Sequence, residues 1–200
     1  MTVTAPRYRV RPLTAATWDA FAELVERNNG VFGGCWCMGF HPERNTEPDP
    51  RGAKEVRVRE GRAHAAVVFD EDGVARGWCQ YGSPEELPSI KHRRVYEQQG
   101  QARPDWRITC FYVDKTHRRR GIARAALAGA LDQIGEDGGG LVEAISEVTA
   151  GREAHGRFLF SATVELFEEF GFHRVAQVGK HAWIVTRVID RPEPRPALRC

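Results

Sequence analysis

The sequence lacks the features that mark several classes of protein. None of its apolar runs approaches the ~20 residues that a membrane-spanning helix needs, and residues 1–11 hold no apolar segment between their basic side chains. These residues therefore do not resemble a signal peptide. We expect a cytoplasmic protein with no membrane partner, and 200 residues are enough for one domain with its own core.

Charge of neither sign is in excess. The chain has 29 lysine and arginine residues against 27 aspartate and glutamate residues, for a formal net charge of +2. This balance argues against a nucleic-acid partner, which would require a dominant basic surface. Basic residues do gather at 91–94 and at 117–120, but such a cluster alone is typical of a solvated surface.

Cysteine is sparse, and its pattern fits no disulfide framework. The chain has five cysteines, an odd number in a chain that is not small. Cys35 and Cys37 form a single Cys-x-Cys pair, whereas structural zinc sites usually combine two longer-spaced pairs. We therefore expect no metal, and we interpret Cys79 and Cys110, which lie in apolar runs, as small buried side chains. A metal- or redox-responsive site at Cys35, Cys37 and Cys79 is a weaker hypothesis.

The spacing of apolar residues predicts an α/β fold with a mixed sheet. Strands are expected at residues 7–11, 64–69, 74–81, 107–113, 141–145, 172–178 and 181–188, and helices at 14–27, 53–60, 121–136 and 161–170. Thr17 and Ser161 are the expected N-caps of two of these helices, and residues 83–104 form a loop or a loose helical insertion. We place one domain at residues 1–189 and a flexible proline-rich tail at 190–200.

Residues 113–123 combine a strand end, a short polar loop, a glycine and the start of an alanine-rich helix. The first turn of a helix carries unpaired backbone N–H groups and the positive end of the helix dipole, so phosphates bind there readily. Gly121 and Ala123 keep the backbone open, beside the positive side chains of Arg118, Arg119 and Arg120. Because G-x-G-x-x-G and G-x-x-x-x-G-K-[ST] are both missing, this anion site is neither a dinucleotide fingerprint nor a P-loop.

The residues Arg118-x-x-Gly121-x-Ala123 match the [QR]-x-x-G-x-[GA] signature of the GNAT (GCN5-related N-acetyltransferase) family, and the sequence resembles a bacterial member of it. The order of expected elements over residues 8–188 is similar too, as is a late helix that ends in Gly-Phe at 161–172. Lys115 departs from the pattern, because many members carry proline there. The resemblance implies a GNAT-like fold, with a mixed, mostly antiparallel sheet flanked by helices.

The resemblance also implies that acetyl-CoA is the co-substrate. Its pyrophosphate would rest on the backbone N–H groups of residues 119–123, which are Arg119, Arg120, Gly121, Ile122 and Ala123, beside Arg118. Its pantetheine would run between the strands at 107–113 and 141–145, and would pair with main chain near Tyr112 and Val113.

Direct attack of a substrate amine on the thioester is the chemistry that the resemblance implies. The amine, with a pKa near ~10.4, must lose a proton, and the leaving thiolate, near ~8.5, takes one. The family's usual acid, a tyrosine of the late helix, is replaced here by Phe167, and Ser161 is a substitute unless it only caps the helix. Glu143 is the candidate base unless it faces solvent at a sheet edge. Weaker candidates are Glu147, Asp105, Glu85 and His64.

Two hypotheses on function follow. The first is an N-acetyltransferase that acts on a small-molecule amine or a peptide. The second is a non-catalytic sensor or interaction module that binds acyl-CoA, which the missing tyrosine favours slightly. The acceptor would bind near residues 32–40, including Trp36, and residues 81–103. The sequence leaves the oligomeric state open, a homodimer included.

Overall fold

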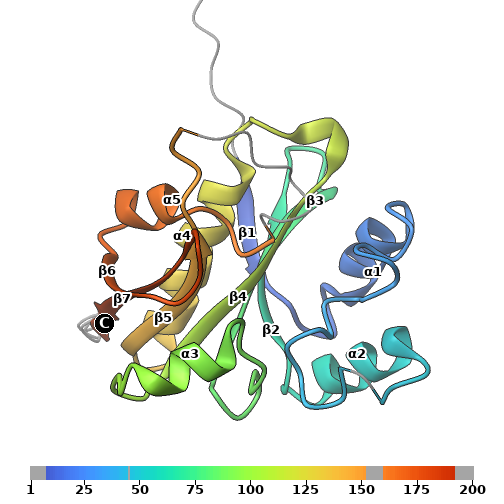
Figure 1. Ribbon diagram of the computed structural model, residues 1–200. Coiled ribbons are helices and arrows are strands. Elements are labelled where there is room, and N and C mark those ends of the chain that lie inside the picture. Colours follow the sequence, from blue (N-terminus) through green and yellow to red (C-terminus); the bar gives the residue numbers. More distant parts are fainter. Residues whose placement is uncertain (1–7, 45, 152–159, 192–200) are drawn as a thin grey trace, which may run out of the picture.

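The computed structural model describes residues 8–44, 46–151 and 160–191 (Figure 1). Most of the expected tail at 190–200, and Arg7 of the first expected strand, lie outside the described residues. Among the helices of the described residues, none combines the length and apolarity that crossing a membrane requires.

A single seven-stranded sheet runs through the molecule in the order β1-β2-β3-β4-β5-β7-β6. Its neighbouring strands are antiparallel except β4 and β5, which are parallel. This confirms the expected α/β fold with a mixed, mostly antiparallel sheet. The strands are β1 (Arg9–Pro12), β2 (His64–Phe69), β3 (Ala75–Gly82), β4 (Trp106–Val113), β5 (Gly140–Glu147), β6 (His173–Gln177) and β7 (Ala182–Ile189).

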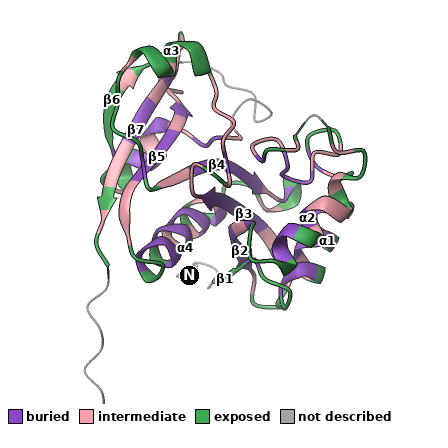
Figure 2. Ribbon diagram, turned by 90° about the horizontal axis from the view of Figure 1, so that it is seen from below, coloured by how far each residue is buried: buried purple, intermediate pink, exposed green. Residues whose placement is uncertain are grey.

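Helices cover both faces of the sheet. Figure 1 shows α1 (Trp18–Glu26) and α2 (Pro50–Arg59) on one face, and α4 (Ile122–Glu136) with α5 (Val164–Glu169) on the other. Alternate residues of the strands supply two cores, so that Val67 packs toward α1 while Val68 packs toward α4. The short helix α3 (Arg93–Gln98) and β6 lie at the exposed periphery (Figure 2).

Two glycines let α4 lie close to the sheet. A Cβ on Gly129 of α4 would stand 2.3 Å from Val10 Cγ1 of β1. A Cβ on Gly77 of β3 would stand 2.5 Å from the carbonyl oxygen of Tyr112 and 2.7 Å from Ile122 Cγ2. All three distances are shorter than real Cβ contacts, so glycine at 129 lets the middle of α4 approach β1, and glycine at 77 lets the start of α4 approach β3 and β4.

Thr109 is the extra residue of a β-bulge in β4. Gln80 of β3 pairs with Cys110, whereas the next residue, Tyr81, pairs with Ile108. Thr109 therefore has no cross-strand partner, and its hydroxyl donates instead to Gln80 Oε1 at 3.0 Å. A bulge of this kind bends its strand and shifts the alternation of side chains between faces.

The bulge separates β4 from β5. The two strands pair only between Trp106–Ile108 and residues 142–144, although β5 stays paired with β7 up to Glu147. Past the bulge, Cys110 and Tyr112 face α1. Beyond the bulge, the edge of β4 is no longer paired with β5. This edge forms one wall of the site described below.

Of the two expected N-caps, Thr17 holds the N-cap position of α1 but makes no side-chain capping bond, and Ser161 is wrong. Thr17 precedes α1, but its side chain does not cap the helix; it accepts from Thr14 N and donates to Pro12 O. Ser161 does not cap α5, which begins later, at Val164, with Thr163 Oγ1 accepting from Leu166 N at 3.2 Å. In both cases the apolar periodicity predicted the helix correctly, but the hydroxyl forms hydrogen bonds with groups other than the N–H groups of the first helical turn.

Candidate functional site

A cavity of about 590 Å³ lies where β4 leaves β5, between the start of α4 and the start of α5. We name it the α4 groove. Several residues expected to bind a cofactor line it: Tyr112, Val113, Arg118, Arg119, Gly121, Ile122 and Ala123. Arg120 does not line it, and Arg124, which the sequence analysis missed, does. Arg124 falls on the first turn of α4, so helical spacing from Gly121 could have found it.

The N-terminus of α4 is open toward this groove. Gly121 precedes the helix with a φ of 82° and provides no side-chain cap. A Cβ on Gly121 would meet nothing within 4 Å. Within the described residues, the N–H groups of Ile122 and Ala123 have no intramolecular acceptor, as expected for the first turn of a helix. The helix therefore presents free donors and the positive end of its dipole to the groove.

Positive charge exceeds negative charge around the groove. Lys115, Arg118 and Arg119 are exposed, and in the part of the chain that the structure describes they form no ion pair. The Arg124 guanidinium is neutralised by Glu169, at 2.6 Å. The rim thus has uncompensated positive charge beside the helix N-terminus, an arrangement that suits a phosphate ligand.

Asp114, at the end of β4, is neutralised rather than aimed at the groove. Its carboxylate accepts from Thr116 N at 3.1 Å and from Arg27 Nη2 at 3.2 Å. Burial opposes ionisation, but these donors hold the pKa of Asp114 below its ordinary value. The carboxylate therefore fixes the turn after β4 and does not repel an anion at Arg118.

The free edge of β4 has unsatisfied polar groups. The Tyr112 hydroxyl is buried and has no hydrogen-bond partner among the described residues. Its ring stacks on Trp78 at 4.9 Å and meets the edge of Phe32 at 6.0 Å. The N–H of Phe111 donates to the carbonyl of Phe160 at 2.6 Å. The segment that begins at Phe160 therefore forms the wall of the α4 groove opposite β4.

A second cavity of about 750 Å³ opens on the α1 face of the sheet, which we name the thiol cavity. Phe32 and Phe160 line both cavities, so the two are adjacent. Phe40, Ile90, Lys91 and three cysteines also line the thiol cavity: Cys35, Cys37 and Cys110. Segments 32–40 and 81–103 both contribute, as expected for an acceptor site.

Trp36 does not line this cavity. It is buried and stacks on Trp18, with ring centroids 6.2 Å apart. The Arg51 guanidinium lies near both rings, 5.6 Å from the centroid of Trp36 and 5.9 Å from that of Trp18. Trp36 was expected in the acceptor site, but it packs in the hydrophobic core instead.

Glu143 is buried on an internal strand, so its alternative interpretation as a solvent-facing edge residue is wrong. Tyr96 Oη donates to its carboxylate at 3.0 Å, and Arg107 Nε lies 3.7 Å away. Burial raises the pKa of Glu143, while Tyr96 and Arg107 oppose the rise. Glu143 and Lys91 both line a small pocket, which shares Phe40, Ile90 and Lys91 with the thiol cavity.

Ser161 is buried and belongs to the lining of neither cavity. Its Oγ accepts from Lys91 Nζ at 3.1 Å. Lys91 also lies over the Phe160 ring at 4.4 Å and 3.7 Å from Glu147. Burial lowers the pKa of Lys91, and Glu147 opposes the change. The sequence placed Lys91 in a basic cluster but not in the site.

Phe167, at the position of the family's usual acid, is fully buried. Its ring packs against Phe111 and Phe172 at 6.0 and 5.0 Å, and it does not line the α4 groove.

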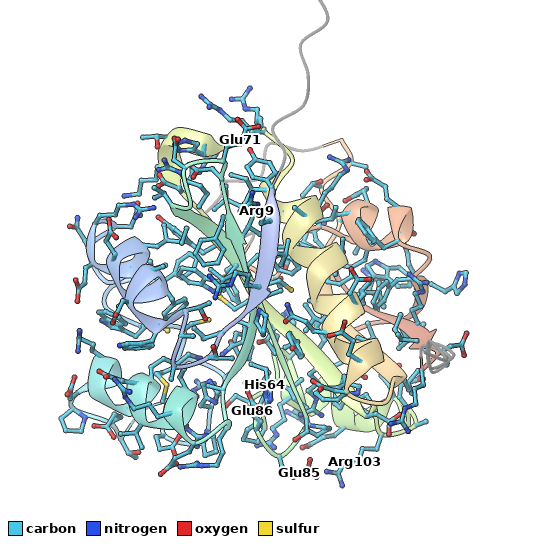
Figure 3. The ribbon with its side chains drawn as sticks, turned by 180° about the vertical axis from the view of Figure 1, so that it is seen from behind. Arg9, His64, Glu71, Glu85, Glu86 and Arg103 are labelled. Atoms are coloured by element: carbon cyan, nitrogen blue, oxygen red, sulfur yellow. The ribbon has the colours of Figure 1, made fainter. Side chains whose placement is uncertain are left out.

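Three of the weaker base candidates are held in contacts with other residues and line neither of the two larger cavities. His64 is paired with Glu86, and Glu85 with Arg103, at the same end of the molecule (Figure 3). Asp105 accepts from Leu141 N at 2.7 Å. Across the described residues, no group of three or more histidine, cysteine or acidic side chains could hold a metal ion.

Comparisons with known proteins agree with this geometry. The model of the acetyltransferase (GNAT) family matches residues 21–172, a range that includes the open helix start and both cavities. No curated protein matches the sequence.

Several solved structures share the fold. A putative acetyltransferase from Acinetobacter baylyi is 14% identical with a TM-score of 0.56, over 96% of this chain and 97% of its own. A GCN5-related N-acetyltransferase from Kribbella flavida is 17% identical with a TM-score of 0.52, over 90% and 97%. A mosquito arylalkylamine N-acetyltransferase-like protein is 11% identical with a TM-score of 0.52, over 91% and 100%.

Proposed function

The chain belongs to the acetyltransferase (GNAT) family, and from this premise we propose that it transfers an acetyl group from acetyl-CoA to a primary amine by direct attack. The observation that carries the proposal is the open N-terminus of α4 beside unpaired basic side chains in the α4 groove. The acceptor is a small-molecule amine or a peptide N-terminus.

The start of α4 supports a site for the pyrophosphate of acetyl-CoA. Free N–H groups of Ile122 and Ala123 would donate to the phosphate oxygens, and Gly121 lets those oxygens approach the backbone. Arg118 and Arg119 would add positive charge from the rim. Arg120 lies off the groove, and we assign it only a long-range electrostatic role.

The splayed strands support a site for the pantetheine and the acyl group. The β4 edge beyond Thr109 has lost its β5 partner. The N–H of Phe111 donates to the carbonyl of Phe160, and we assign the main chain near Tyr112 and Val113 to the amide groups of the pantetheine. The orphaned Tyr112 hydroxyl, buried at the same wall, is a polar group that fits a ligand in the groove. The thioester would then lie near Phe160, where the groove meets the thiol cavity.

Two proton transfers are assigned to two buried side chains, Glu143 and Ser161. Glu143 is our candidate base, because its raised pKa favours proton uptake from an ammonium group. Ser161 is our candidate acid: Lys91 donates to its Oγ, which leaves the hydroxyl proton available for the departing thiolate. Both side chains are covered in the described structure, so each would act through a water molecule or a small movement of the wall.

A second candidate function is acyl-CoA binding without catalysis. The specific observation in its favour is that Phe167 lies in the core and Tyr112 is the single tyrosine that lines the described groove. A sensor or interaction module would need the α4 groove and no acid or base.

The experiment is a calorimetric titration with acetyl-CoA, followed by measurement of free thiol release across a panel of amines. Binding with amine-dependent thiol release would support the transferase. Binding without release for small amines and peptides alike would favour the second candidate. No binding would overturn both, because both need the α4 groove.

A further inference from the structure

Two cysteines from distant parts of the chain face each other at the thiol cavity. Cys37 lies in the connection between α1 and α2, and Cys110 lies on β4, directly after the bulge. Gln80 Nε2 donates to the carbonyl of Cys37 at 2.9 Å, and Gln80 is the cross-strand partner of Cys110. Gln80 thereby holds the Cys37 backbone near Cys110, and both residues line the same cavity.

The Cys37 sulfur is surrounded by groups that favour its anion. Trp78 Nε1 donates to Cys37 Sγ at 3.3 Å. Burial raises the pKa of Cys37, but the Cys110 thiol, the Lys54 ammonium and the Trp78 indole together bring it below its ordinary value. The pKa of Cys110 shifts in the opposite direction, because the neighbouring Cys37 sulfur and burial both raise it. Of the two thiols, Cys37 is therefore the more acidic.

Lys54 is a buried ammonium group without a carboxylate partner. It is 1% exposed, and its Nζ lies 3.0 Å from His41 Nε2. His41 is neutral there, because burial and the Lys54 charge lower its pKa to about 2. Within the described residues Lys54 forms no ion pair; burial lowers the pKa of Lys54, and Cys37 is the group that opposes this change most strongly. A charge this deep needs a counter-ion, and the Cys37 sulfur is placed to supply it.

Cys35 provides an internal comparison. It lies two residues from Cys37 and lines the same cavity, yet burial and the nearby Cys37 raise its pKa. Cys79 is fully buried, lines none of the described cavities, and has a pKa raised well above the ordinary value by burial. The surroundings therefore single out Cys37 among the four described cysteines.

We propose that Cys37 and Cys110 form a dithiol site that reacts with hydroperoxides. The Cys37 thiolate attacks the terminal peroxide oxygen; the S–O bond forms, the O–O bond breaks, and hydroxide leaves from hydrogen peroxide or alkoxide from an organic hydroperoxide. The Cys110 thiol then attacks the sulfenic sulfur, so that the S–S bond forms and the sulfenic oxygen leaves as water. Two thiols are oxidised by two electrons in total, and one peroxide is reduced.

The reaction would link the 28–40 segment covalently to β4 at the wall shared with the α4 groove. Its chemistry does not depend on acetyl transfer. Measuring the oxidation and alkylation of these cysteines therefore tests this site separately from the proposed function.

The test treats the full-length, reduced protein with hydrogen peroxide and maps disulfides by peptide mass spectrometry. Cys200 lies outside the described residues and is replaced by serine in every sample, so that it cannot form mixed disulfides. We expect a Cys37–Cys110 disulfide while Cys35 and Cys79 stay reduced. Iodoacetamide should alkylate Cys37 about tenfold faster than Cys35 at pH 7.

Variants make the assignment specific. Cys110→Ala should stop the reaction at a sulfenic acid on Cys37 that dimedone traps, and Cys35→Ser should leave disulfide formation unchanged. Lys54→Met should slow alkylation of Cys37 about tenfold in protein that circular dichroism shows to be folded. A Cys35–Cys37 disulfide, equal alkylation of Cys35 and Cys37, or folded protein that peroxide leaves with free thiols would each overturn the proposal.

Discussion

At the scale of single residues, the buried His41 and the partly buried His64 should respond to pH in opposite directions. The Glu86 carboxylate, 2.5 Å from His64 Nδ1, raises the pKa of His64 above its ordinary 6.5. Burial, together with Lys54, lowers the pKa of His41 to about 2. His64 is thus stabilised as a cation by folding, and His41 as a neutral ring.

His41 should weaken the fold in acid. Its folded pKa lies below its unfolded value of 6.5, so the unfolded chain takes up the extra proton and stability falls as pH drops below 6.5. The loss approaches about 1.4 kcal/mol per pH unit from this group alone. Urea unfolding at pH 6.5 and 5.5 should show a smaller loss in His41→Gln than in the unsubstituted protein. Equal losses would contradict the buried, neutral assignment.

His64 should have the reverse effect. Its folded pKa is raised, so its contribution is fully present below pH 6.5 and is lost as pH rises through the folded pKa. We expect His64→Gln to destabilise the protein more at pH 6 than at pH 8 in the same urea assay. A variant that loses as much stability at pH 8 would show that the Glu86 contact acts through packing rather than charge.

At the scale of elements, the start of α4 offers the sharpest test of the α4 groove. We expect Gly121→Glu to weaken acetyl-CoA binding about a hundredfold or more, about 2.7 kcal/mol. The carboxylate would fill the open space beside Gly121 and repel the phosphates. Calorimetric titration measures the loss.

Gly73→Glu is the matched control for this variant. Gly73 has a φ of 76°, close to the 82° of Gly121, and a Cβ there also meets nothing within 4 Å. Both variants should therefore lose about 1–3 kcal/mol of stability to backbone strain. Only Gly121→Glu should lose affinity, because Gly73 lies in the β2–β3 turn. Equal loss in both would assign the effect to strain.

How much the sequence could predict differs between elements. Helical spacing and the glycine signature located α4 and its groove, because both depend on residues close together in the chain. The bulge at Thr109 was not predicted, because the apolar run of 107–113 looks like a regular strand and the shift appears only against β3. The burial of Glu143 was missed for a similar reason, since its partners Tyr96 and Arg107 come from other elements.

At the scale of the whole molecule, the two cavities meet at one wall. Phe32 comes from the segment after α1, and Phe160 from the segment before α5, yet both line the α4 groove and the thiol cavity. Their rings lie 6.0 Å apart. Among the described residues, Phe32 and Phe160 are the ones that line both cavities. An acyl donor bound in the α4 groove and an amine acceptor bound in the thiol cavity would therefore meet beside these two rings.

Binding in the α4 groove should stabilise the entire fold. Acetyl-CoA at 100 times its Kd should add about 2.7 kcal/mol to the free energy of unfolding. For a chain of this size we expect the Tm to rise by about 5–10 °C. The rise should shrink as sodium chloride increases from 50 to 500 mM, since Lys115, Arg118 and Arg119 are exposed and salt screens them. Differential scanning calorimetry measures this shift; at the same acetyl-CoA concentration, a hundredfold weaker Kd should leave Gly121→Glu with at most about 0.4 kcal/mol of the stabilisation. A salt-independent rise would place the ligand away from these charges and would contradict the assignment of the phosphates to α4.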